Sequence, residues 1–234
     1  MKLFGIDSPL FRTLGKLADL MILNLVFLIC CLPIVTIGAA LTGLNYVTLK
    51  MAEDEEGYIV KGFFKSFRQN FVQSTIIWII MLVVGLVIGL DFYILKASSG
   101  TFITVIRAVL AITAFIYLMV FTYLFAVLAR FYNNIRNTFR NALLMSIADL
   151  PKTLIMMVIM AGAVILTFFN SQTLSYGMLV WILFGFALIA YCNGFFLKKI
   201  FAKYTPKEEE EADPDNWIVE ETENETVTES SSES

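Results

Sequence analysis

The sequence predicts an all-α fold: a polytopic bundle of five or six transmembrane helices, with cytoplasmic amphipathic interfacial helices and a disordered acidic C-terminal tail. Three observations predict it. The first is composition, because 58% of the 234 residues are hydrophobic, 16% are charged and the mean hydropathy is +0.76, too apolar for a soluble domain. The second is a set of four runs that lack Asp, Glu, Lys and Arg, each long enough to cross a bilayer at least once. These runs are residues 20–49, 69–90, 108–129 and 153–197.

The third observation is the division of charge. Residues 1–203 hold sixteen basic and eight acidic residues, a net charge of +8, and are predicted to form the transmembrane helical domain. Residues 204–234 hold twelve acidic residues and one lysine, a net charge of −11. This segment is rich in Glu, Ser and Thr and has too few apolar residues to fold alone, so it is predicted to be a disordered tail.

Proline residues indicate where helices start and break in the N-terminal region and in the first run. Ser8 followed by Pro9 is a typical helix start, and the leucines that follow at helical spacing predict a short interfacial helix. The first run has thirty residues, which as one straight helix would span about 45 Å against a hydrocarbon core of roughly 30 Å. Pro33 near its middle predicts a break within residues 32–38. The run is therefore either one long kinked helix or two short passes.

The remaining spans follow in order. Residues 69–95 form one span, and a short loop over 96–101 leads to a span centred on 108–129. The last run has 45 residues, and the polar cluster at 170–173 divides it into spans over 153–169 and 174–197.

Basic residues set the predicted orientation, because Lys and Arg concentrate in cytoplasmic loops. With six passes, fifteen of the seventeen Lys and Arg residues lie on one side, whereas Lys96 and Arg107 lie on the other. With five passes the division is twelve against five. Six passes with both termini in the cytoplasm are therefore favoured.

Two cytoplasmic segments have the pattern of amphipathic helices. In the first, Val60, Phe64, Phe67 and Phe71 recur at helical spacing, and in the second Phe131, Ile135, Phe139 and Ala142 do the same, each beside basic residues. Such helices lie among lipid headgroups or present a face to a partner. The residues predicted to make partner or headgroup contacts are Phe64, Phe67, Arg68, Phe71, Arg130, Arg136, Phe139 and Arg140.

Chemical signals for catalysis are missing from the sequence. It contains no histidine, no phosphate-binding glycine loop and no nucleophile with a plausible base, so no catalytic, cofactor-binding or metal-binding residue is predicted. The run Glu53-Asp54-Glu55-Glu56 could bind a cation loosely, but an exposed acidic loop is the favoured interpretation. Asn24 and Asn193, among other amides in the apolar runs, could join helices. The basic body is explained by membrane topology, and no nucleic-acid partner is expected.

Several short stretches together resemble the YesL family of bacterial integral membrane proteins, a family built on a domain of unknown function. The stretches are Asp19-Leu20, Leu23-Asn24-Leu25, Leu32-Pro33-Ile34-Val35-Thr36-Ile37-Gly38, Glu55-Glu56-Gly57-Tyr58, Phe64-Lys65-Ser66-Phe67-Arg68-Gln69-Asn70-Phe71, Ala129-Arg130-Phe131, Asn141-Ala142-Leu143-Leu144 and Leu150-Pro151-Lys152-Thr153. The resemblance covers roughly residues 3–200 and implies a bacterial plasma membrane location. It also implies a role near carbohydrate uptake, since family members are commonly encoded beside sugar ABC transporters.

The favoured hypothesis is a non-catalytic accessory subunit that contacts the lipid bilayer and ABC transporter subunits in carbohydrate uptake. The alternative is a small permease in its own right. An enzyme is not expected, because the sequence offers scattered amides and no convergent set of acid–base groups.

Overall fold

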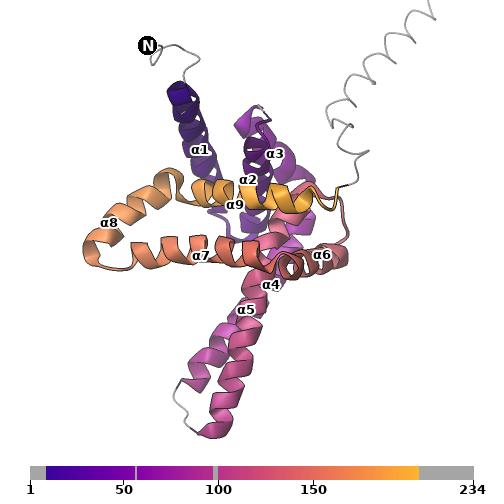
Figure 1. The fold of residues 1–234 in the computed structure, drawn as a ribbon, viewed down its shortest axis with the longest axis vertical. Coiled ribbons are helices and arrows are strands. Elements are labelled where there is room, and N and C mark those ends of the chain that lie inside the picture. Colours follow the sequence, from indigo (N-terminus) through magenta and orange to yellow (C-terminus); the bar gives the residue numbers. More distant parts are fainter. Residues whose placement is uncertain (1–8, 56, 97–99, 206–234) are drawn as a thin grey trace, which may run out of the picture. The chain divides into compact units, whose positions relative to one another are not determined.

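The computed structural model describes residues 9–55, 57–96 and 100–205, with side chains from Thr13 onward, and every regular element in these ranges is helical (Figure 1). The chain divides into two compact units, Met1–Lys198 and Lys199–Ser234. The elements are α1 (Pro9–Cys31), the 3₁₀ turn η1 (Ile34–Thr36), α2 (Ile37–Ala52), α3 (Ile59–Gln69), α4 (Phe71–Leu95), α5 (Thr101–Arg130), α6 (Ile135–Ala148), α7 (Leu150–Thr167), α8 (Ser171–Val180), the π-helical turn η2 (Trp181–Gly185) and α9 (Phe186–Phe201).

Among the described residues, six helical segments are long and apolar enough to cross a membrane, which confirms the predicted all-α bundle. Their bounds lie close to those expected from the charge-free runs. The segments are Thr13–Cys31, Ile34–Ala52, Phe71–Leu95, Thr101–Arg130, Leu150–Thr167 and Ser171–Phe201.

The first apolar run forms two helices instead of one. Helix α1 ends at Cys31, Pro33 interrupts the backbone, and α2 begins at Ile37. The Thr36 hydroxyl donates to the Cys30 carbonyl at 2.6 Å and Trp78 of α4 donates to the Ile34 carbonyl at 2.9 Å, so the turn is held on both sides. Lys16 near the start of α1 pairs with Asp54 just beyond α2 at 2.6 Å, which brings the outer ends of the two helices together. The run therefore folds as a helical hairpin.

The N-terminal amphipathic stretch differs from its prediction as a separate interfacial helix. It continues without a break into α1, which starts at Pro9 as the sequence indicates. The predicted disordered tail lies outside the described residues from 206 onward; within the second unit, the Thr205 hydroxyl closes the end of α9 by donating to the Phe201 carbonyl at 3.1 Å.

Helix α2 lies at the centre of the first unit, with 56% of its span buried. Small residues allow this position: a Cβ on Gly43 would lie 3.0 Å from the Phe63 ring of α3, and a Cβ on Gly194 of α9 would lie 3.1 Å from the Thr48 carbonyl oxygen. Leu20, Leu23 and Phe27 of α1 pack on the same helix in one buried cluster. Close approach of this kind stabilises membrane helices, because lipid leaves packing and hydrogen bonds as the main attractive forces.

Two further hairpins complete the first unit. Helices α4 and α5 are joined where the Tyr117 hydroxyl donates to the Met81 carbonyl at 3.0 Å, and near their tip Arg107 donates to the Leu95 carbonyl at 2.6 Å. Helices α7 and α8 meet at a turn where the side chain of Asn170 caps α8. The two hairpins diverge in Figure 1, and the buried residues of α5 lie in its C-terminal half, between Met119 and Leu128.

The amide of Asn24 joins α1 to the π-helical turn η2. Its nitrogen donates to the carbonyls of Trp181 and Ile182 at 3.0 and 2.8 Å, and its oxygen accepts from the Ala187 N–H at 3.0 Å. A π-helical turn disturbs the regular helical hydrogen bonds. One buried side chain thus satisfies three backbone groups at the disturbance, which gives Asn24 the helix-joining role expected for it.

Candidate functional site

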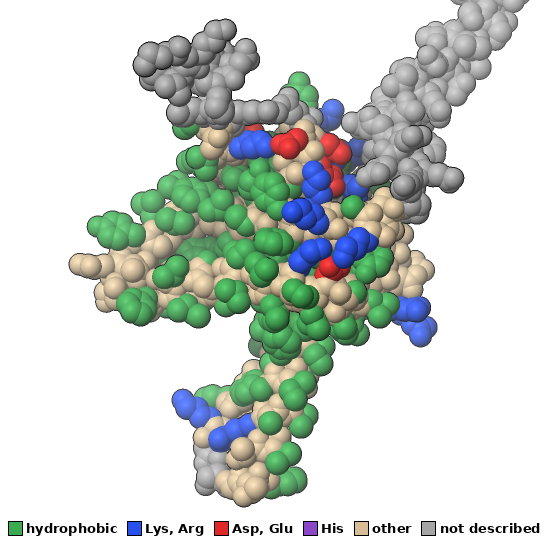
Figure 2. Space-filling view, in the orientation of Figure 1, with side chains coloured by type: hydrophobic (Ala, Val, Ile, Leu, Met, Phe, Trp, Pro, Cys, Tyr) green, Lys and Arg blue, Asp and Glu red, His purple; other side chains and the backbone are tan. Residues whose placement is uncertain are grey.

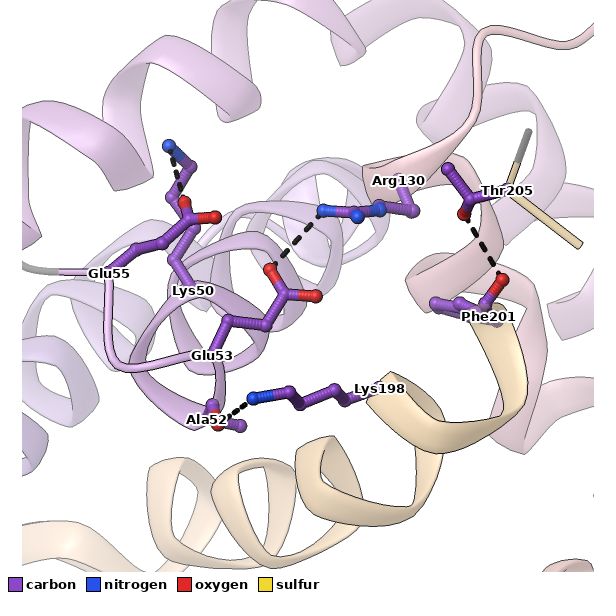
Figure 3. A network of polar contacts seen from close by, with 8 residues as sticks. All are labelled: Lys50, Ala52, Glu53, Glu55, Arg130, Lys198, Phe201 and Thr205. Carbon is purple, nitrogen blue, oxygen red and sulfur yellow. Dashed lines mark hydrogen bonds and ion pairs between the residues drawn. The ribbon is translucent and has the colours of Figure 1, made fainter. Parts of the chain in front are cut away.

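Most of the charged side chains visible in Figure 2 gather on one side of the first unit, a smaller basic group lies at the tip of the α4–α5 hairpin, and the flanks of the helices are largely apolar. The larger group includes the residues around the C-terminal end of α2. Acidic residues that follow α2 form ion pairs with basic residues of α1, α2 and α5. Besides Lys16 with Asp54, these pairs are Arg130 with Glu53 at 3.3 Å and Lys50 with Glu55 at 3.2 Å (Figure 3). Lys198 of α9 adds a hydrogen bond of 3.2 Å to the Ala52 carbonyl.

The acidic run after α2 agrees with the exposed loop that the sequence favoured at Asp54 and Glu55, and differs from it at Glu53. The Glu53 side chain is only 15% exposed, and Asp54 adopts the left-handed conformation with a φ of 59°. Burial raises the pKa of the Glu53 carboxyl, and the charges of Arg130, Lys198 and Lys50 oppose that rise. These groups tie the ends of α1, α2, α5 and α9 together, so we assign this cluster a structural role. Within the described ranges, no group of three or more His, Cys, Asp and Glu side chains could hold a metal ion.

The face that α3 packs against the core differs from the apolar stripe of Val60, Phe64, Phe67 and Phe71 that the sequence indicated. Phe63 and Ser66 are fully buried and Phe67 packs partly against the core, whereas Val60 and Phe64 remain exposed. Three aromatic rings of α3 and the Phe71 ring at the start of α4 follow one another, with centroids 5.5 to 6.2 Å apart. Phe63 is the residue that the sequence interpretation missed, and its neighbour across the interface is Gly43.

Helix α6 buries Thr138, Ala142, Met145 and Ser146. Phe139 is half-buried and Arg140 is exposed, so these two predicted contact residues occupy different environments. The C-terminal end of α6 is fixed by Thr153 of α7, whose hydroxyl donates to the Ser146 carbonyl at 2.9 Å and bonds the Tyr123 hydroxyl of α5 at 2.8 Å.

A groove opens between the N-terminal half of α4 and the start of α6. We call it the α4–α6 groove; it has a volume of about 530 Å³ and continues into a polar cleft of about 370 Å³, with Gln73 and Asn134 shared by both. Its lining is Arg68, Gln69, Val72, Gln73, Ile76, Asn134, Ile135 and Arg136. The polar cleft adds Asn70, Leu128, Phe131, Tyr132, Asn133 and Asn137.

The predicted contact residues thus separate into three groups. Arg68 and Arg136 line the same groove, Arg130 is paired with Glu53, and Phe64 and Arg140 lie on the outer faces of α3 and α6. The remaining three, Phe67, Phe71 and Phe139, are half-buried and form no group of their own. The amides of the groove were not among the predicted residues. In the sequence, only the concentration of amides at Asn133, Asn134 and Asn137 pointed to these groove residues. The structure shows why they matter, because Gln73, sixty residues earlier, donates to the Asn133 carbonyl.

Residues 20–92 match a family model described as a protein of unknown function, DUF624. No curated protein and no solved structure matches the chain. The matched residues extend from α1 to α4 and include the hairpin around Pro33, the ion-paired loop and α3. The chain is accordingly a multi-pass membrane protein that carries a region similar to this uncharacterised family.

Proposed function

We propose that this protein is a non-catalytic interaction subunit of the bacterial plasma membrane, which docks on an ABC transporter for carbohydrates through the outer faces of α3 and α6. The resemblance to the YesL family supports the link to sugar uptake, and the match over residues 20–92 is compatible with that resemblance. The distribution of Lys and Arg along the sequence supports a cytoplasmic position for the charged end of the spans around the C-terminal end of α2, and for the C-terminus of the chain.

The observation that carries the proposal is the composition of those outer faces. On α3, the exposed residues include Val60 and Phe64 beside Lys61, and on α6 they include Leu144 and Ile147 beside Arg140. Exposed apolar side chains next to basic groups suit an acidic or amphipathic protein surface, and they also suit lipid headgroups. The faces lie beside the ion-paired ends of the spans, where a soluble ATPase or a permease loop would be within reach.

Three fully buried polar residues of the spans favour docking over solute transport. Asn24, Tyr123 and Thr153 are fully buried, and each has hydrogen bonds to other helices. A solute pathway needs polar groups that face a cavity, whereas these groups hold helices together.

The test is affinity purification of the full chain from native membranes in mild detergent, with a tag after Ser234. The wild-type protein should recover an ABC permease or its ATPase, and the double substitution Phe64→Glu with Arg140→Glu should lose it. Phe64→Leu with Arg140→Lys is the matched control and should retain the partner. The proposal is wrong if the wild-type protein recovers no transporter subunit, or if the charge-reversed variant accumulates normally and recovers as much as the control.

A further inference from the structure

We propose that the α4–α6 groove is a binding site for the phosphodiester headgroup of an anionic phospholipid, with Arg68 and Arg136 as the phosphate ligands. This site goes beyond the docking function, because it takes a small amphipathic ligand and uses residues other than Phe64 and Arg140.

The first argument is charge. The groove lining contains two arginines and no carboxylate. Neither Arg68 nor Arg136 has an ion-pair partner among the described residues, whereas Lys16, Lys50, Arg130 and Lys152 are each paired with an Asp or Glu. Two guanidinium groups on opposite walls of one groove can each offer a fork of N–H donors to a phosphate group.

The second argument is the set of neutral donors around these arginines. Asn134 precedes α6 without capping it through its side chain, so the first N–H groups of the helix have no side-chain acceptor. A helix N-terminus with free N–H groups favours an anion, and here it adds to two arginines already in place. The side chains of Gln69 and Asn134 lie in the same lining and can bond the hydroxyls of a glycerol headgroup.

The third argument is the rigidity of the walls. Gln73 of α4 donates to the Asn133 carbonyl, and its amide also lies 3.5 Å from the Thr138 hydroxyl of α6. Asn70 donates to the Ser66 carbonyl at 3.2 Å and so fixes the junction of α3 with α4. The groove is therefore largely formed before a ligand arrives, which lowers the entropic cost of binding.

The fourth argument selects a lipid over a free phosphate ester. Val72 and Ile76 lie one turn apart in the groove lining and are 70% and 41% exposed. They belong to the first turns of α4, which crosses the membrane from Phe71. The groove thus changes from basic and amide-rich to aliphatic along the direction in which α4 enters the bilayer. A phosphate ester with an acyl chain matches both parts, whereas a free phosphate leaves the aliphatic part unused.

The test uses the purified full chain in neutral detergent and measures lipid binding by native mass spectrometry, with phosphatidylglycerol and phosphatidylcholine as probes. The wild-type protein should prefer phosphatidylglycerol. The groove variant, Arg68→Gln with Arg136→Gln, should bind phosphatidylglycerol at least about tenfold more weakly, since two charge-assisted contacts are lost. The matched control is Lys61→Gln with Arg140→Gln, which removes the same charge from the same two helices outside the groove lining.

Several results would overturn the proposal. Equal weakening in the groove variant and the control would show general attraction of anionic lipid to basic helices. Equal binding of the two lipids by the wild-type protein would show that the protein does not select an anionic headgroup. This result needs no variant, so the test does not depend on how well a variant folds. Displacement of phosphatidylglycerol by millimolar inorganic phosphate or glycerol phosphate would identify a site for a free phosphate ester.

Discussion

At the residue scale, Asn24 and Glu53 show how single polar side chains organise an apolar bundle. Asn24 satisfies backbone groups of a π-helical turn that lies more than 150 residues later in the chain. Lipid cannot hydrogen-bond such groups, so each one left unpaired in a membrane costs free energy. Glu53 is a partly buried carboxylate whose partners come from α2, α5 and α9.

Replacement of Asn24 by leucine should lower the free energy of unfolding by about 1–3 kcal/mol, because it removes the hydrogen bonds to the Trp181 and Ile182 carbonyls and from the Ala187 N–H. Asn45→Leu is the control, since the Asn45 side chain bonds only the Leu41 carbonyl of its own helix in the described structure. SDS titration in mixed micelles, followed by circular dichroism, measures both variants. Equal stability of Asn24→Leu and the wild-type protein would contradict the assigned role.

A pH prediction follows from Glu53. Its pKa is raised above the ordinary 4.5 by burial, so the folded state holds the proton more tightly than the unfolded state does. The stabilisation from that proton is complete below pH 4.5 and is lost as the pH rises through the raised pKa. The stability of the wild-type protein relative to Glu53→Gln should therefore fall as the pH rises across this window.

The measurement for Glu53 is the unfolding titration repeated from pH 4 to pH 8. Glu55→Gln serves as the control, because the Glu55 side chain is 51% exposed and is the like-charged neighbour in the same loop. A difference between wild type and Glu53→Gln that stays constant with pH would refute the prediction.

At the element scale, the crossing of α2 and α4 depends on one glycine. A Cβ on Gly38 would collide with the Ser74 carbonyl oxygen and would lie 2.6 Å from the Trp78 Cβ. Gly38→Ala should therefore separate the two helices and lower the free energy of unfolding by about 1–3 kcal/mol. Gly89→Ala on α4 is the control, because a Cβ there meets nothing within 4 Å, and it should be neutral or stabilising by up to about 1 kcal/mol. Equal effects of the two substitutions in the unfolding titration would contradict this crossing.

The elements also show what could be predicted from the sequence. The spans could be predicted from composition alone, because the length of a run without charged residues shows whether it can cross a bilayer. Pro33 marks the break in the first run. The buried face of α3 could not be predicted, since Phe63, Phe64 and Phe67 together cover a wide part of the helix surface. Phe63 is the buried one because it packs against Gly43 of α2, which its own local sequence does not indicate. The groove could not be predicted either, because Arg68 and Arg136 line it together and nothing in their local sequences indicates that they share one surface.

At the scale of the whole first unit, three hairpins return the chain to one charged end. The pairs of Lys16 with Asp54 and of Arg130 with Glu53, together with the bond from Lys198 to Ala52, join chain segments that border four different spans. This agrees with an even number of crossings, under which the basic residues divide fifteen to two. A single crossing by residues 20–49 would place Lys16 and Asp54 on opposite sides of the membrane.

This arrangement predicts which loops a membrane-impermeant maleimide can reach in intact cells. In a background with Cys30, Cys31 and Cys192 replaced by serine, Thr101→Cys and Ser171→Cys should be labelled from outside, because both lie at hairpin tips. Tyr58→Cys and Tyr132→Cys, whose native side chains are 85% and 93% exposed, should be labelled only after the membrane is permeabilised. Labelling of Tyr132→Cys in intact cells would show that the orientation in the membrane is the opposite of the proposed one. Labelling of Tyr58→Cys and Thr101→Cys from the same side would contradict a crossing by α4, and with it the placement of the α4–α6 groove at a membrane surface.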